Sequence, residues 1–502
     1  MTASNLFDFF KSKAPNDPAT PFLELGDGKV VSYGDMDART AQIAHVLKAA
    51  GVEPGGRVAA QVDKSPEALL IYLASLRAGA VYLPLNNAYT NAEIDYFLSD
   101  AEPAVFVCRP KDAEAIRPLA DKAGVKALLT LNADGTGSLT DAADKHPKTF
   151  ETVDRAADDL AAILYTSGTT GRPKGAMLTH NNMQSNCTTL RDLWQFTAND
   201  RLLHALPIFH THGLFVATNV TLASGATIIF FPRFDADELI SNMPKASVLM
   251  GVPTFYSRLL ASETFTKDVA SKMRLFISGS APLSAETHAA FKDRCGHAIL
   301  ERYGMTETNM IASNPYEGDR KPGSVGHPLD GVDVRIADTD GAPLAQGDIG
   351  GIEVRGPNVF TGYWRRPEKT AEEFRDGGWF ITGDLGHFDD DGYLHIDGRA
   401  KDLIISGGFN VYPAEVEAAI DGLPGIDETA VIGVPHADFG EGVVAVVAGG
   451  SSDEKTVLEG LSELLARYKQ PKRVIFLDAL PRNAMGKIEK AKLRETYADL
   501  LK

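Results

Sequence analysis

The stretch Leu164–Ala176 reads LYTSGTTGRPKGA, and it carries an apolar run into a loop of hydroxyls and glycines. The run Leu160–Leu164 is typical of a buried strand. Glycines let the backbone approach an anion closely, while hydroxyls and Lys174 add donors and positive charge. The stretch therefore predicts a strand followed by a phosphate-binding loop. The alternative is a solvated turn, because ordinary loops favour the same residue types.

This loop differs from the Walker A motif, in which the second glycine is followed by lysine and then serine or threonine. Here the residue five positions after Gly168 is Pro173. A phosphate site of another class is therefore expected.

Length and charge narrow the range of functions. With 502 residues, the chain exceeds the roughly 300 at which a single core stops growing, so several domains are expected. Its formal net charge of -17 opposes binding to nucleic acid or to anionic lipid, so we expect neither a nucleic acid nor a membrane partner. The N-terminus shows neither a signal peptide nor a spanning pattern, which predicts a cytoplasmic location. Three widely separated cysteines favour reduced thiols.

The order of apolar runs predicts an α/β fold. Residues 22–154 alternate strand and helix patterns, which indicates a parallel sheet covered on both faces. Residues 126–150 are turn-rich, and we expect a surface excursion there. A second alternating stretch follows the loop, and residues 323–398 change to short alternating runs typical of a small antiparallel or barrel-like unit.

The last hundred residues have a different pattern, with a helix opened by Pro413, several strands, a helix over 455–467 and a last helix from about Glu489. We therefore expect two domains, residues 1–399 and 400–502.

Six motifs occur in an order that resembles the adenylate-forming acyl-CoA synthetase superfamily, from about Val31 to Thr496: YTSGTTGRPKG, SGSAPL, ERYGMTET, TGD, GRAKDLIISGGFNVYPAEVE and PRNAMGK. The resemblance implies stacked α/β sheets with a barrel-like subdomain, followed by a mobile C-terminal domain. It also implies two half-reactions. A carboxylate attacks the α-phosphate of ATP and releases pyrophosphate, and the thiol of CoA then attacks the acyl-adenylate and releases AMP.

The resemblance assigns residues to this chemistry. Catalysis is implied for Lys487, Thr166, His210 and Glu307, and Glu307 would also hold Mg²⁺, to which hard oxygen ligands are suited. Nucleotide contacts are implied for a larger set: Thr166, Ser167, Gly168, Thr169, Thr170, Gly171, Lys174, Ser280, Ala281, Pro282, Tyr303, Gly304, Thr306, Asp384, Arg399, Lys401, Gly407 and Gly408.

Individual residues have plainer alternatives. Tyr303 is expected to stack on adenine, but a lone tyrosine often packs in a core. Asp384 and Arg399 are expected at the ribose, although an aspartate can also cap a turn. Lys401 matches the hinge about which the C-terminal domain would rotate, and its alternative is a surface lysine on a linker.

Lys487 lies in a loop of proline, asparagine and glycine, where a long cation could reach negative charge that develops during adenylation. The resemblance also makes this lysine a plausible target of a lysine acetyltransferase.

The acyl site is implied to include His210, Thr211, Ser278, Arg274, Arg302 and Met305. His210 and His212 lack a third ligand signature, so zinc is a weak interpretation. The motifs look like the malonyl-CoA synthetase branch, and many relatives carry a small residue where this chain has Arg302. A second carboxylate on the substrate would need a buried cation. Arg302 and Arg274 both remain candidates, with a structural role as the alternative for each.

Four competing functions remain at this level: ligation of another short or medium carboxylate, loading of a carrier protein, luciferase-like oxidation and non-enzymatic nucleotide sensing. No phosphopantetheine site lies near the C-terminus, which disfavours a fused carrier. We expect a ligase that joins a small dicarboxylate, malonate or methylmalonate, to CoA with ATP.

Overall fold

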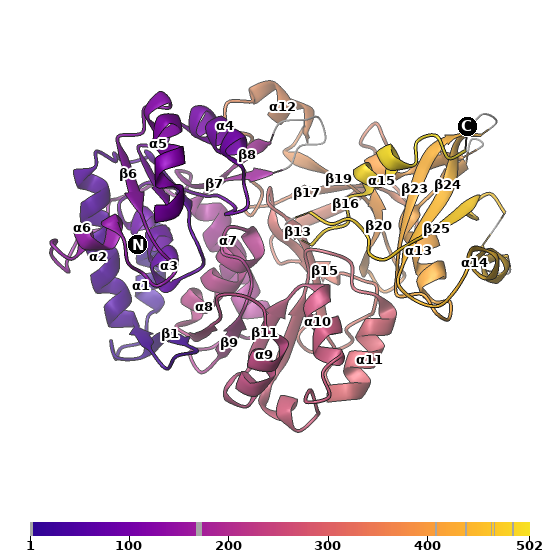
Figure 1. Cartoon of the computed structure of the whole chain (residues 1–502), viewed down its shortest axis with the longest axis horizontal. Coiled ribbons are helices and arrows are strands. Elements are labelled where there is room, and N and C mark those ends of the chain that lie inside the picture. The colour runs from indigo at the N-terminus through magenta and orange to yellow at the C-terminus, as the bar shows by residue number, and fades with distance from the viewer. Residues whose placement is uncertain are drawn as a thin grey trace.

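The computed structural model describes residues 4–166, 173–406, 409–436, 439–462, 464–465, 467–483 and 486–501. The predicted phosphate-loop residues Ser167–Gly171 and the pair Gly407 and Gly408 lie outside this part. Figure 1 shows two large α/β layers that are followed, toward the C-terminus, by two smaller sheets. The fold class predicted from the sequence is confirmed.

The first large sheet has six strands in the order β6-β5-β3-β4-β7-β8. Its strands are parallel except for β8, which returns antiparallel to β7 around the phosphate loop. The bounds are β3 Arg57–Gln61, β4 Val81–Pro84, β5 Val105–Cys108, β6 Ala127–Thr130, β7 Leu160–Thr166 and β8 Lys174–Thr179.

The prediction that residues 126–150 form a turn-rich surface segment is wrong in part, because this segment contains β6 and helix α6 (Ser138–Ala143). β6 is an edge strand that pairs only with β5, and all four of its residues are partly exposed. Such a strand buries too little surface to give a strong hydrophobic signal.

The second large sheet has nine strands in the order β15-β14-β13-β12-β11-β9-β10-β1-β2. Neighbouring strands from β13 to β1 run parallel. The bounds are β1 Pro21–Leu25, β2 Val30–Ser32, β9 Arg201–His204, β10 Thr227–Phe230, β11 Val248–Gly251, β12 Leu275–Ser278, β13 Leu300–Met305, β14 Asn309–Ser313 and β15 His327–Pro328.

Helix α3 (Pro66–Arg77) shows why the two large sheets pack together. Ser65 caps its start, Pro66 occupies the first turn, and residues 68–77 are all buried. A helix that is apolar all round must lie inside a large core. Its side chains join one continuous cluster with residues of both sheets.

Other helices cover the faces of these sheets: α1 Leu6–Lys13, α2 Tyr33–Ala49, α4 Asn91–Ala101, α5 Ala113–Lys122, α7 His180–Leu193, α8 Asn219–Ser224, α9 Ala236–Asn242, α10 Pro253–Leu260 and α11 Ala285–Cys295. Helix α12 (Pro367–Glu372) instead contacts the smaller sheet that follows. Among the described helices, none combines the length and apolarity needed to span a bilayer.

Next comes a five-stranded antiparallel sheet, as the alternating pattern predicts. Its strands are β16 Asp333–Ala337, β17 Gly350–Arg355, β18 Phe374–Arg375, β19 Trp379–Phe388 and β20 Leu394–Arg399.

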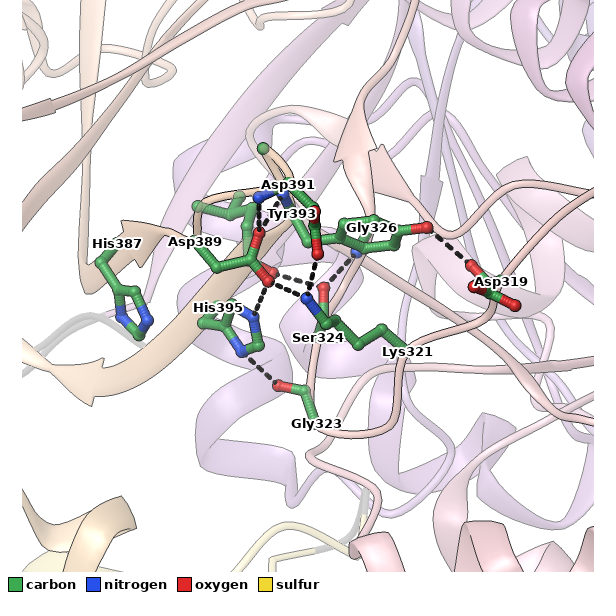
Figure 2. A network of polar contacts seen from close by, with 12 residues as sticks. Asp319, Lys321, Gly323, Ser324, Gly326, His387, Asp389, Asp391, Tyr393 and His395 are labelled. Carbon is green, nitrogen blue, oxygen red and sulfur yellow. Dashed lines mark hydrogen bonds and ion pairs between the residues drawn. The ribbon is translucent and has the colours of Figure 1, made fainter. Parts of the chain in front are cut away.

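A polar network holds the turn of the β19–β20 hairpin against residues 319–326 (Figure 2). The Asp389 carboxylate accepts from Lys321 Nζ at 2.5 Å and contacts His395 Nε2 at 3.1 Å. His395 Nδ1 lies 3.1 Å from the carbonyl oxygen of Gly323, and its ring stacks on that of His387. The hairpin is thereby anchored at the end opposite Arg399.

The last sheet contains β21 Ile404–Ser406, β22 Phe409–Val411, β23 Glu428–His436, β24 Gly440–Ala448 and β25 Arg473–Leu477. Its helices are α13 Pro413–Asp421, α14 Glu454–Leu461 and α15 Lys490–Thr496. Val431 and Val443 belong to one apolar cluster, while Ala430 and Val444 belong to another, so both faces of this sheet are covered. The predicted division between residues 399 and 400 falls in the connection between β20 and β21.

Candidate active site

The candidate site lies at the carboxyl ends of parallel strands, where ligands bind in open α/β sheets. Ser278 ends β12 and is paired with Gly251 at the end of β11 and with Glu301 in β13. Thr166 ends β7 in the other large sheet. Motifs that are distant in sequence therefore meet where the ends of strands from both large sheets face each other, as the 3.4 Å contact between Thr166 Oγ1 and Glu307 shows.

Arg302 in β13 is the most unusual residue of this region. It is only 3% exposed, and two of its nitrogens, Nε and Nη2, have no hydrogen-bond partner among the residues that the structure describes. The guanidinium packs against Gly279 so closely that a Cβ on this glycine would lie 2.3 Å from Arg302 Cζ. Burial lowers the pKa of Arg302 to about 9, opposed by Tyr256. A buried cation without a counterion is costly, so this site favours an anionic ligand.

Three predicted acyl-site residues and the neighbouring His212 also have buried polar atoms that contact no polar group of the described chain: His210 Nε2, Thr211 Oγ1, Ser278 Oγ and His212 Nε2. His212 Nδ1 lies 3.2 Å from Ser280 Oγ. Burial, followed by the charge of Lys487, lowers the pKa of His210 to about 4, so this imidazole is neutral near pH 7. His212 also begins a π-helical turn, a feature frequent at functional sites.

Arg274, the second candidate for the distal carboxylate, lies elsewhere. It precedes β12 at the amino end, whereas Ser278 is at the carboxyl end. Its Nε donates to Asp200 at 2.7 Å, and its Nη1 donates to the carbonyl oxygen of Trp194 at 3.0 Å. The placement of Arg274 in the acyl pocket is therefore corrected in favour of its structural alternative, because its guanidinium is already paired.

The predicted phosphate side contains a connected set of paired side chains. Glu307 is 5% exposed, and its Oε1 lies 3.0 Å from the Tyr363 hydroxyl and 3.4 Å from Thr166 Oγ1. The same hydroxyl lies 2.5 Å from Glu373 Oε2, and Glu373 Oε1 is 2.8 Å from Lys174 Nζ. Burial raises the pKa of Glu307, while Tyr363 opposes the shift. Lys174 is thus held by a carboxylate rather than left free.

The predicted adenine and ribose residues are joined as well. The hydroxyl of Tyr303 donates to Asp384, whose other oxygen lies 2.6 Å from Arg399 Nε. Asp384 and Arg399 are paired residues of β19 and β20, so the hairpin itself sets their separation.

Two backbone positions along the predicted adenine face are special, one in the loop after β12 and one within β13. Ser280 is in the left-handed region with φ of 73°, while Ala281 and Pro282 are exposed beside it. At Gly304, a Cβ would lie 1.9 Å from the carbonyl oxygen of Asn309, so no other residue fits. Two half-buried residues of the same motif follow, Met305 and Thr306.

Lys487 lies where these two sides meet. Its side chain is accessible to solvent, but it is surrounded by enough protein that burial, followed by Arg399, lowers its pKa. Its charge acts on His210 and on Asp384. Lys401 is exposed in the short turn that joins the last two sheets.

Two residues of this site were not anticipated from the sequence, Tyr363 and Glu373. They lie between motifs, in GYWRRPEKTAEEF, and no local pattern separates them from the polar surface of helix α12. Only the fold reveals that they connect Lys174 to Glu307.

Carboxylates and cations lie beside a buried arginine here, and the small C-terminal unit supplies a lysine. This arrangement is expected of an adenylate-forming acid–thiol ligase. The comparisons agree. The AMP-binding enzyme profile matches residues 9–364, and the AMP-binding enzyme C-terminal domain matches residues 415–487. The chain belongs to the AMP-binding enzyme family.

The chain is similar to the ATP-bound crystal structure of MatB from Rhodopseudomonas palustris, with 58% identity, full coverage of both chains and a TM-score of 0.97. Against the apo form of the same protein, the TM-score is 0.87. The structure is therefore closer to the ATP-bound arrangement.

Two curated relatives differ in the acid that they are named for. A feruloyl-CoA synthase from an Amycolatopsis species is 40% identical over 94% of each chain. A malonate–CoA ligase from Arabidopsis thaliana is 33% identical over 94% of this chain and 85% of its own. The family and the acid–thiol ligase activity are common to both, whereas the acid has to be argued from the site.

Proposed function

We propose that this protein joins malonate, or the closely related methylmalonate, to CoA through an acyl-adenylate. The observation that carries the proposal is Arg302, a buried guanidinium with two nitrogens that lack a partner. Arginine can hold a carboxylate with two parallel hydrogen bonds. An aromatic or fatty acid has no second charge to offer and would leave this cation buried and unpaired.

In the first half-reaction, the near carboxylate of the acid attacks the α-phosphorus of ATP and pyrophosphate leaves. Thr166 and Lys174 flank the loop that would hold the β and γ phosphates, and Lys174 would exchange Glu373 for phosphate oxygens. Lys487 would neutralise the charge that develops at the α-phosphate. Positioning and electrostatic stabilisation can supply most of such a barrier.

Glu307 fits a role at Mg²⁺, since it is a buried carboxylate that forms no ion pair with any described residue. Among the described residues, no cluster of three or more His, Cys, Asp or Glu side chains could hold a metal. Mg²⁺ would therefore be held by Glu307, substrate phosphates and water, as is usual for this ion. When bound, it would neutralise phosphate charge.

The second half-reaction would require the C-terminal domain, residues 400–502, to rotate about Lys401. The exposure of Lys401 and its place between two separate sheets support a hinge. CoA would then attack the acyl carbon, and AMP would leave.

The test measures AMP release with malonate, methylmalonate, acetate and ferulate, with and without CoA. We expect the highest kcat/KM with a dicarboxylate. Arg302→Met should lower kcat/KM for malonate by about 100-fold, with little change in the KM for ATP, because a polar recognition group is lost. Acetate, which has no distal carboxylate, should be affected much less.

The matched control is Arg274→Met, which removes an arginine that is paired with Asp200. Assayed below its unfolding temperature, this variant should keep the ratio of malonate to acetate activity. Equal losses with malonate and acetate in Arg302→Met, or a preference of the wild type for ferulate, would refute the proposed substrate.

A further inference from the structure

Lys64 is a half-buried lysine to which neither the motifs nor the proposed chemistry gives a role. It follows β3 in the six-stranded sheet, yet its Nζ reaches His204, the last residue of β9 in the nine-stranded sheet. Nζ lies 3.0 Å from His204 Nδ1 and 2.8 Å from the carbonyl oxygen of His204. It also lies 4.5 Å from the centre of the Phe230 ring. Within the described chain, no carboxylate forms an ion pair with Lys64, and burial alone lowers its pKa.

The contacts of His204 define its protonation. Nε2 lies 2.8 Å from the carbonyl oxygen of Gly213, which can only accept, so Nε2 must carry a proton. Burial, followed by the charge of Lys64, lowers the pKa of His204 to about 3, so the ring is neutral. Nδ1 is then unprotonated and accepts a hydrogen bond from Lys64. The Gly213 carbonyl and the lysine therefore favour the same neutral form of the ring.

His204 in turn fixes the backbone of the predicted acyl-site segment. The Gly213 carbonyl oxygen accepts from His204 and, at 2.9 Å, from Thr218 Oγ1. A Cβ on Gly213 would lie 2.0 Å from the carbonyl oxygen of Pro207, so this segment folds tightly on itself. Gly213 directly follows His212, which contacts Ser280. A shift of this peptide must move the side chains at positions 210–212.

We propose that Lys64 is a positioning residue for the acid substrate: through His204 it holds the Gly213 peptide and thereby the segment His210–His212. The inference rests on the proposed function, because it takes this segment as part of the acyl site. Lys64 itself touches no reacting atom in this arrangement.

Lys64→Met removes the donor but keeps much of the volume. We expect the KM for the acid to rise about tenfold, which is the loss of one good hydrogen bond, with the KM for ATP changed less than twofold. Lys64→Arg keeps N–H donors and should restore part of the acid KM. Lys126→Met is the control, because Lys126 also donates to a backbone carbonyl, that of Gly51, but does so at the surface and away from the site.

The second measurement does not depend on activity. In protein labelled with ¹⁵N-histidine, the wild-type His204 should show one protonated and one unprotonated ring nitrogen, assigned by its loss in His204→Gln. In Lys64→Met, the Nδ1 signal should shift, whereas Lys126→Met should leave it in place. An unchanged His204 spectrum, or equal rises in the KM for acid and for ATP, would overturn the inference.

Kinetics are measured with whichever acid the wild type uses best. A preference for an acid other than malonate would refute the proposed substrate and still leave the role of Lys64 testable. If Lys64→Met fails to fold, the spectrum and acid KM of Lys64→Arg decide the question: an unperturbed Nδ1 signal and a near-normal KM support the inference, and a shifted signal with a normal KM refutes it.

Discussion

The predicted acyl side and the predicted nucleotide side of the site differ in whether their buried polar groups are hydrogen-bonded to other side chains. On the acyl side, five residues have buried polar atoms without a protein partner: His210, Thr211, His212, Ser278 and Arg302. On the nucleotide side, Glu307, Tyr363, Glu373 and Lys174 are bonded to one another, as are Tyr303, Asp384 and Arg399.

The difference indicates two ways of preparing for a charged ligand. A paired group gives up one partner to gain another, so ATP would replace interactions that already exist. An unpaired buried donor gives up no protein partner, so a small anion can bind it without breaking a contact within the described chain. Preorganised donors of this kind suit a ligand with few atoms, and the predictions that follow probe this contrast.

The largest effect is expected at Lys487, which reaches both sides. Lys487→Ala should reduce adenylate formation by about 1,000-fold, because a cation aimed at developing charge is lost. Thioester formation from supplied malonyl-adenylate should be largely retained. Pyrophosphate exchange and single-turnover thioester assays separate the two steps, and equal losses in both would contradict the assignment. Acetylation of Lys487, which would remove the same charge, remains a prediction.

Arg274→Met should show that an arginine paired with a buried carboxylate serves stability. Its partner Asp200 has a side chain only 5% exposed, and the loss of the cation should lower the free energy of unfolding by about 3 kcal/mol. Denaturant unfolding measures this loss. Arg355→Met is the matched control, since its ion pair with Asp333 is exposed at the surface and should contribute less than about 1 kcal/mol. Similar losses in both variants would remove the distinction.

Lys174→Ala tests exchange on the nucleotide side. Because Lys174 already has Glu373 as a partner, its net gain on binding phosphate is modest, and we expect pyrophosphate exchange to fall roughly tenfold. Thioester formation from supplied adenylate should change little, since pyrophosphate has left by then. An unchanged exchange rate would argue against a phosphate role.

The smallest effect is expected for a substitution of Glu301. This residue precedes Arg302 in β13, so its side chain points to the opposite face of the strand. Burial raises the pKa of Glu301 from 4.5 to about 8, with only weak backbone hydrogen bonds opposing the shift. The folded protein therefore keeps a proton that the unfolded chain loses, and stability falls as the pH rises from 4.5 toward 8. Glu301→Gln should make stability depend less on pH in this range, and it should raise the free energy of unfolding at pH 8 by about 1 kcal/mol. Melting temperatures at pH 6, 7 and 8 measure it, and parallel curves for both proteins would contradict the shift.

The fold could be predicted from the sequence, because periodic apolar runs and six ordered motifs are local signals. The roles of the two arginines could not. Arg302 and Arg274 both flank pocket motifs, and only the fold shows that Arg274 meets Asp200 at the far end of β12. The sequence pattern did not predict strand β6, because an edge strand buries little apolar surface and gives only a weak hydrophobic signal.

The side-chain contacts that connect separate motifs also could not be predicted from local sequence patterns. Tyr363 and Glu373 reach Glu307 and Lys174 across large distances in sequence, and Lys64 reaches His204 across 140 positions. Such contacts depend on the packing of whole sheets, which no local pattern encodes.

Gly279 has a consequence for how substrate range can change over time. The Arg302 guanidinium occupies the space where any side chain at position 279 would begin. A single change from glycine to alanine would therefore force the Arg302 guanidinium to move, while the codon for the arginine stays the same. If this protein acts on diacids as proposed, one added methyl group at the end of a neighbouring strand would weaken that preference, and its removal would restore it.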